Sequence, residues 1–254
     1  MIPTYHRPQT LDQALTLITR SHPKTLPLGG GTFLSHKGSE TVEVVDLQAL
    51  GLNQIKKSGN NLEVGATTTL QQLLESPQCL EAMQIALKLE APLNLRNTGT
   101  VAGTLVVADG RSTFTTVLLA LDTRCIIQPN DQELHVGDLL PLRESQLSRK
   151  LITGFVLPVN VRIAFDYVSR TPADKPIVCV ALCQWPSGRT RLAVGGYGRS
   201  SLLAMDGTES DGLGAAARNA FAQAGDEWAS ADYRQDVAAT LANRCLAKID
   251  LGMK

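Results

Sequence analysis

The chain has 254 residues, of which 43% are hydrophobic and 19% charged, and its 24 Lys and Arg residues balance its 24 Asp and Glu residues. This length allows a sizeable interior divided into two or three compact units. Balanced charge provides no net field for nucleic acid or an anionic membrane, and no apolar run approaches the roughly 20 residues of a spanning helix. We expect a globular, cytoplasmic protein without a signal peptide.

The cysteines and histidines of the chain do not form metal-binding spacings. The five cysteines are scattered and include no C-x-x-C pair. Cys179 and Cys183 are four apart in a strand-like sequence, so both lie on one face, and we expect small buried residues rather than metal ligands. The histidines are also unclustered: His6, His22, His36 and His135. We predict no disulfide framework and no metal site.

The first 57 residues predict a small α/β unit. Thr10 can cap a helix, with Gln13 at the capping-box position and an apolar stripe beginning at Leu11. The segment 41–47, TVEVVDL, is rich in β-branched residues and predicts a strand. Between the helix and the strand lies a run of three glycines.

Residues 58–155 predict a second unit. It contains a strand in LEVGA, a helix over 70–75 capped by Thr69, and a helical segment around 81–90. The following segment, 94–113, is rich in Thr, Gly and Asn, and predicts irregular backbone, which is more often functional than idle at that length. A buried helix, TTVLLALD, and a strand, RCIIQ, complete the unit.

The remaining residues, 156–254, differ in pattern. PIVCVALCQW and TRLAVGGYG predict a hairpin that turns at residues 186–188, and two helices follow, the last over 234–249. The predicted class is α+β, in three consecutive units.

Two glycine-containing segments are the candidates for ligand binding. Consecutive glycines in LPLGGGTFL can direct main-chain N–H groups into a concave nest that suits phosphate, and Thr32 adds a hydroxyl. The stretch fits neither G-x-G-x-x-G nor G-x-x-x-x-G-K-[ST], so a tight turn remains the alternative. RNTGTVAGT offers similar small residues, and its alternative interpretation is a point where backbones cross closely.

Several motifs, in order along essentially the whole chain, resemble one family. They are YHRP followed by TLDQAL, LGGGT, LEVGATTTL, LRNTGTVAGT, LLALD, and the helix SADYRQDVAATLANRCL. This set resembles the FAD-binding, or medium, subunits of the molybdenum hydroxylases, the group that contains xanthine dehydrogenases and aerobic carbon monoxide dehydrogenases.

The resemblance implies a two-subdomain FAD-binding domain, with lobes 1–57 and 58–155, followed by a small α+β C-terminal domain, 156–254. It implies that electrons pass from a molybdenum-cofactor large subunit, through a small subunit with [2Fe–2S] clusters, to FAD and then to an acceptor. No catalytic residue is expected in this chain. The residues implied to bind FAD, mostly through main chain, are Leu28, Gly29, Gly30, Gly31, Thr32, Phe33, Thr100, Val101, Ala102, Gly103 and Thr104.

The sequence departs from the family in the flavin site. Ala102-Gly103-Thr104 stands where the family has G-G-N, Thr113 where it has an Asp for the cofactor's hydroxyls, and Tyr167 where it has a Lys near the flavin. Thr113 could still hydrogen-bond the cofactor, and Tyr167 could stack on the flavin. The alternative is a scaffold subunit with weakened or lost FAD binding. An unrelated phosphate-ligand protein, such as a one-chain nucleotide-sugar reductase with a similar flavin fold, is a further alternative, which the C-terminal Tyr-Arg helix disfavours.

Overall fold

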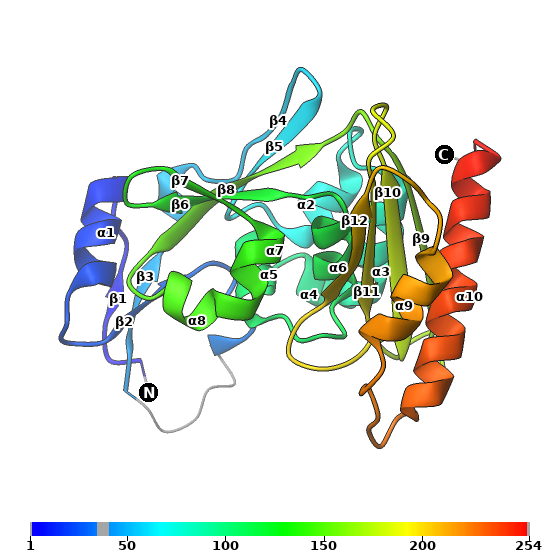
Figure 1. The fold of residues 1–254 in the computed structure, drawn as a ribbon. Helices are drawn as coiled ribbons and strands as arrows, with labels where there is room; N and C mark the ends of the chain where they lie inside the picture. Colours follow the sequence, from blue (N-terminus) through cyan, green and yellow to red (C-terminus); the bar gives the residue numbers. More distant parts are fainter. Residues whose placement is uncertain (1, 35–40, 253–254) are drawn as a thin grey trace. The chain divides into compact units, whose positions relative to one another are not determined.

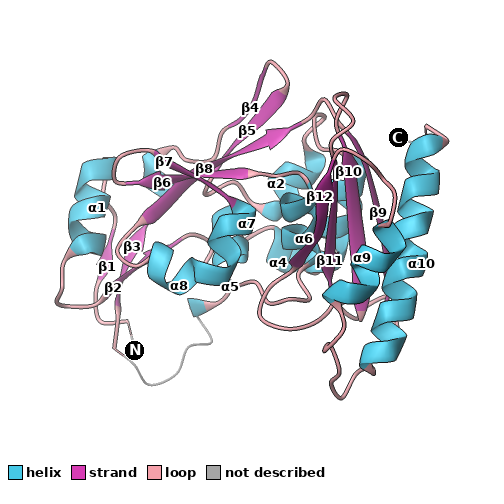
Figure 2. Cartoon of the chain, viewed as in Figure 1, coloured by secondary structure: helices cyan, strands magenta, loops and turns pink. Residues whose placement is uncertain are grey.

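The computed structural model describes residues 2–34 and 41–252 (Figure 1). The chain divides into two compact units, each assembled from separate stretches. Unit 1 contains Met1–Ser76, Leu93–Val107 and Arg124–Leu157, and unit 2 contains Pro77–Pro92, Ala108–Thr123 and Pro158–Lys254. Both units combine helices and strands, and in unit 2 the four strands follow one another between two pairs of helices, as is typical of the predicted α+β class (Figure 2).

Unit 1 contains a three-stranded sheet, in the order β1-β3-β2, and a five-stranded sheet, in the order β4-β5-β8-β6-β7. The strands of the smaller sheet are parallel. The elements of this unit are β1 (Tyr5–His6), α1 (Leu11–Thr19), β2 (Thr25–Leu28), β3 (Glu43–Asp46), η2 (Gln48–Leu50), β4 (Ile55–Ser58), β5 (Asn61–Gly65), α2 (Leu70–Glu75), α4 (Leu93–Arg96), α5 (Val101–Val107), β6 (Arg124–Gln128), β7 (Gln132–His135), α7 (Val136–Leu139), η3 (Leu140–Leu142), α8 (Arg143–Gln146) and β8 (Leu151–Pro158).

The first helix forms as its sequence predicts. Thr10 Oγ1 accepts a hydrogen bond from Gln13 N at 3.3 Å, which satisfies one of the free N–H groups of the first turn. Ala14 and Ile18, four residues apart on one face, pack in a buried cluster with Val45 of β3. The helix therefore fixes the small sheet from which the first glycine segment emerges.

The YHRP motif has a structural role in this sheet. Its first two residues form β1, and Tyr5 pairs with Val44 in the parallel register. The Tyr5 hydroxyl donates to Asp46, and His6 Nε2 lies 2.6 Å from Glu43 Oε2. The hydrogen bond with His6, with those of Arg20 and Thr4, holds the pKa of Glu43 below its usual range despite partial desolvation. These contacts attach the N-terminal strand to β3.

Unit 2 is built on an antiparallel four-stranded sheet in the order β12-β11-β10-β9. Figure 1 shows α9 and α10 on one face of this sheet and α3 and α6 on the other, in agreement with their contacts. The elements of this unit are α3 (Glu81–Glu90), α6 (Thr113–Ala120), β9 (Arg162–Val168), β10 (Val178–Gln184), β11 (Thr190–Gly195), β12 (Leu202–Gly207), α9 (Leu213–Ala220) and α10 (Ala231–Asp250).

Side chains of β10 point alternately to the two faces of the sheet, and both faces are covered by helices. Val178, Val180 and Leu182 are fully buried in one cluster with residues of α9 and α10. Cys179 lies on the opposite face, where its sulfur is 3.6 Å from Thr116 Oγ1 of α6. Burial raises the pKa of Cys179 to about 12, and Cys183 is also fully buried. The prediction that both cysteines are small buried residues is confirmed.

The structure corrects one expectation about the middle of the chain. The segment 94–113 is not wholly irregular, because it forms the end of α4 and all of α5. The two compact units also do not follow the bounds 1–57, 58–155 and 156–254, and the three domains with those bounds stay a prediction. The physical reason is that the apolar helices α3 and α6 pack against β9, β10 and β11, although they precede these strands in the chain by many residues.

Within the described residues, none of the helices is long and apolar enough to span a bilayer.

Candidate functional site

Unit 1 contains a cavity of about 290 Å³, near the lower end of the range for small-molecule sites. Most of its walls are glycine or aliphatic residues. It is lined by Leu26, Pro27, Gly29, Gly30, Gly31, Thr32, Phe33, Leu34, Leu47, Ala66, Thr67, Thr100, Ala102, Gly103, Val106, Val107, Leu147, Lys150, Leu151 and Ile152. Both predicted glycine segments therefore contribute to one cavity.

The two glycine segments also cross each other in direct contact. A Cβ added at Gly30 would lie 1.6 Å from the carbonyl oxygen of Thr98, and one at Gly29 would lie 2.5 Å from Thr100 Oγ1. No side chain fits at these distances, so glycine is required here for the backbone crossing itself. Gly31 has φ of 70°, in the left-handed region that glycine adopts without strain. The close crossing and the ligand-facing wall, which the sequence offered as alternatives, are both features of the same segment.

The second segment becomes helical at the cavity wall. Gly103 N donates to Thr100 Oγ1 at 3.2 Å, so the Thr100 side chain caps the first turn of α5. Val101 is 1% exposed and belongs to the core, whereas Ala102 and Gly103 face the cavity. Thr104 Oγ1 donates back to the Thr100 carbonyl at 2.9 Å. Among the residues predicted in unit 1, Leu28, Val101 and Thr104 do not line the cavity.

Two polar side chains in the lining were not among the predicted site residues. Thr67 is 8% exposed, and it contributes a hydroxyl group to the lining. Lys150 is the only charged residue among the described residues that line the cavity. Thr67 lies within the motif LEVGATTTL, so a sequence signal existed for it. The local sequence contains no motif that predicts Lys150 as a site residue. Lys150 lines the cavity because it directly precedes β8.

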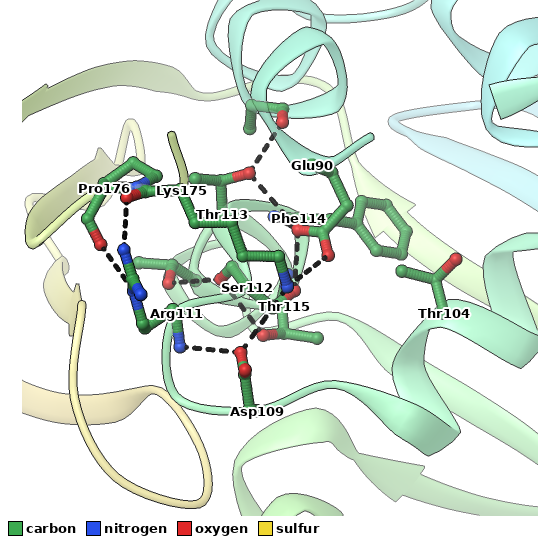
Figure 3. A network of polar contacts seen from close by, with 12 residues as sticks. Glu90, Thr104, Asp109, Arg111, Ser112, Thr113, Phe114, Thr115, Lys175 and Pro176 are labelled. Atoms are coloured by element: carbon green, nitrogen blue, oxygen red, sulfur yellow. Dashed lines mark hydrogen bonds and ion pairs between the residues drawn. The ribbon is translucent and has the colours of Figure 1, made fainter. Parts of the chain in front are cut away.

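Thr113 is part of a buried polar network in unit 2 (Figure 3). It is the first residue of α6, it is 1% exposed, and its hydroxyl donates to the carbonyl of Ala86 at 2.7 Å. The Glu90 carboxylate accepts from Phe114 N at 3.0 Å and from Ser112 Oγ at 2.8 Å, and Thr113 Oγ1 lies 3.2 Å from it. Glu90, from α3, thus places a negative charge at the N-terminus of α6, where the helix dipole favours it.

This arrangement gives Thr113 a role inside unit 2. The resemblance implies a carboxylate at position 113, and here a carboxylate reaches the same helix end from Glu90, whose side chain is 6% exposed. The Thr113 hydroxyl has one proton, which the short contact with Ala86 uses. Cofactor binding by Thr113 stays a prediction.

Thr113→Asp is expected to destabilise the protein by about 1–3 kcal/mol, because a second carboxylate would lie against buried Glu90 and the hydrogen bond to Ala86 would be lost. Chemical denaturation of the full chain measures this change. The double variant Glu90→Gln/Thr113→Asp removes the repulsion and is expected to recover part of the loss. Equal stability of Thr113→Asp and the native chain would contradict the network.

Tyr167 and Arg111 also have partners within unit 2. Tyr167, on β9, is half-buried, and its ring is 6.1 Å from that of Phe165 at an interplanar angle of 27°. Arg111 donates to the carbonyls of Pro176 and Lys175 (Figure 3). Its guanidinium lies 4.5 Å from the centroid of the Trp228 ring. The role of Tyr167 toward a flavin stays a prediction.

Metal-ligating side chains do not gather in the described part of the chain, where groups of three or more His, Cys, Asp or Glu residues suited to a metal are absent. Of the four histidines, His36 lies outside the described residues. The candidate ligand site is the cavity in unit 1, which both glycine segments line.

Comparison with known proteins gives concordant matches. The sequence matches the family described as "FAD binding domain in molybdopterin dehydrogenase" over residues 2–160. The chain is 26% identical to the uncharacterized protein YgfM of Escherichia coli K12 over 95% of this chain and 94% of that protein. It is 28% identical to the 6-hydroxypseudooxynicotine dehydrogenase complex subunit alpha of Paenarthrobacter nicotinovorans, over 94% of this chain and 91% of that subunit.

The fold also has a close structural counterpart. A chain of the reconstituted CO dehydrogenase from Oligotropha carboxidovorans superimposes with a TM-score of 0.83 over 99% of each chain, at 21% identity. At this level of identity the likeness concerns the fold alone.

Proposed function

Because the chain belongs to the family of FAD binding domains in molybdopterin dehydrogenases, we propose that it is the subunit that carries electrons through FAD in a molybdenum hydroxylase-type complex. The family assignment confirms the predicted resemblance, the fold class and FAD as the cofactor. It also makes the chain an oxidoreductase subunit. The route of the electrons and the identity of the partner subunits form the proposal.

The cavity in unit 1 is suited to part of an FAD molecule. Its glycine wall allows a ligand to approach the main chain, its aliphatic walls suit a flat ring system, and Thr67 offers a hydroxyl. We assign the cavity wall from Gly29 to Phe33, with Thr100, Ala102 and Gly103, to cofactor binding. FAD, when bound, supplies a ring that takes up and releases electrons. The chain itself binds and orients the cofactor.

The remaining predicted residues have less support as cofactor ligands. Leu28, Val101 and Thr104 flank the cavity wall and hold its backbone, since Thr104 Oγ1 donates to the Thr100 carbonyl. Thr113 and Tyr167 belong to unit 2, and their contacts described above support structural roles there. We retain all five as proposed rather than established parts of the site.

The partners are proposed from the names of the relatives. One relative is a subunit of a dehydrogenase complex, and another is the medium chain of glyceraldehyde dehydrogenase from Sulfolobus acidocaldarius. We propose that this chain likewise works with a molybdenum-cofactor large subunit and a small [2Fe–2S] subunit in the cytoplasm. The alternative of a scaffold that has lost FAD is not supported, because the cavity keeps its glycine wall and polar groups.

The observation that carries the proposal is that two glycine segments, far apart in sequence, line one cavity. We expect the purified full chain to quench flavin fluorescence on titration with FAD, with a dissociation constant in the micromolar range or below. We expect the complex with its partners to release FAD on denaturation. Absence of flavin from the complex, together with no binding by the chain, would refute the proposal.

A further inference from the structure

Lys150 is a cation placed in the wall of a cavity that is otherwise uncharged among the described residues. It directly precedes β8, and its N–H donates to the carbonyl of Leu147, another lining residue, at 3.1 Å. Arg149 has φ of 57°, which turns the chain sharply between these two lining positions. The local backbone thus holds both ends of this turn at the cavity.

The charge of Lys150 has no compensating carboxylate in the described part of the chain. Its ammonium donates one hydrogen bond, at 3.1 Å, to Gln132 Oε1, which is a neutral acceptor. Other half-buried cations of the chain are paired: Arg20 with Glu43, Arg189 with Asp206. An ammonium has three donors, so two remain for a ligand.

A second polar group lies in the cavity wall. Thr67 is 8% exposed and lines the same cavity as Lys150. Its hydroxyl can donate a hydrogen bond to a ligand oxygen. The lining therefore combines a positive charge with a hydroxyl donor, and both suit the oxygens of an anion.

We propose that Lys150 and Thr67 bind the phosphate oxygens of the cofactor, in a cavity whose glycine wall contributes only main chain. The inference rests on the proposed function, because it is the FAD diphosphate that brings an anion into this cavity. It adds to the site a charged side chain that lies outside both glycine segments.

The test compares Lys150→Gln with Arg149→Gln, an adjacent exposed cation that does not line the cavity, so that both variants lose one positive charge. The readout is the FAD dissociation constant of the full chain, measured by flavin fluorescence at several salt concentrations. Lys150→Gln is expected to weaken FAD about 10- to 100-fold and to reduce the salt dependence of binding. Arg149→Gln is expected to change the constant less than about threefold.

A second pair of variants tests the hydroxyl. Thr67→Val keeps the shape and removes the donor, whereas Thr67→Ser keeps the donor, so only the valine variant is expected to weaken FAD, by about 3- to 10-fold. Thermal unfolding of each variant checks that the fold is retained.

The possible failures are distinguishable. If the native chain and its complex bind no FAD, the proposed function fails and this inference fails with it. If the native chain binds FAD but Lys150→Gln binds it equally well, or loses affinity without a change in salt dependence, only the role of Lys150 is overturned.

Discussion

Gly30→Ala is expected to destabilise the protein by at least about 3 kcal/mol and to weaken FAD binding more than tenfold, the largest effect of any single methyl group in unit 1. The added Cβ would lie 1.6 Å from the carbonyl oxygen of Thr98 and 2.5 Å from its carbonyl carbon. Both are backbone atoms, which cannot rotate away as a side chain can. Relief requires the two glycine segments to separate, and these segments form the cavity wall.

Urea denaturation and FAD titration of the same preparation measure both effects. Gly207→Ala is the matched control, because its Cβ would meet only the end of the Met205 side chain, at 3.7 Å. We expect the control to change stability by less than about 1 kcal/mol. A Gly30→Ala protein with native stability and native FAD affinity would show that the segments do not cross as described.

Arg234→Met is expected to destabilise the protein by about 3–5 kcal/mol, because it removes one partner of a buried, hydrogen-bonded charge network. Arg234 is 0% exposed. Its guanidinium donates to the carbonyl of Ala229 at 2.8 Å, to Asp226 Oδ1 at 2.7 Å, and to the carbonyls of Ala224 and Ile177. Three acceptors in the loop before α10 and one next to the start of β10, the Ile177 carbonyl, would lose their donor.

The same substitution is expected to change the titration of Asp226. Burial alone would raise the pKa of Asp226, but the hydrogen bond from Arg234 and those from Trp228 N and Ala229 N keep it below its usual range. Loss of Arg234 should therefore raise this pKa. The stability that the depressed pKa contributes is present above the unfolded-state pKa and is lost as pH falls through the folded-state value.

The control for this prediction is Arg244→Met, an exposed arginine on the same helix α10. It loses the same charge and is expected to change stability by less than about 0.5 kcal/mol. Thermal unfolding at neutral pH compares the two variants. Equal melting temperatures would contradict the role assigned to Arg234.

Gly30 and Arg234 each belong to a sequence motif of the family, and the structure shows which contacts each motif makes. The C-terminal Tyr-Arg helix marks the family, yet Tyr233 is 44% exposed and Arg234 ties the preceding loop to the sheet. In this structure the arginine of the Tyr-Arg motif therefore stabilises the loop before α10. The LGGGT motif serves the crossing of two segments and the wall of a cavity at the same place.

Local signals in the sequence determined most of the helices and strands. Thr69 caps α2 as predicted, in a capping box with Gln72, Ser230 caps α10, and the hairpin of β10 and β11 turns where Pro186 to Gly188 predicts it. α5 was missed, because Val101 and Gly103 are poor helix formers. It forms since Thr100 caps it and since Val101 and Leu105 are buried.

The sequence by itself determined the family, the cofactor and the two glycine segments, because each depends on residues close together along the chain. Only the tertiary structure decided that Glu90 lies at the start of α6, and that Thr67 and Lys150 share a cavity with Gly30. It also decided that α3 and α6 belong with the C-terminal sheet. These contacts join residues far apart in the chain, and they arise because buried apolar faces and polar groups must find partners wherever packing brings them together.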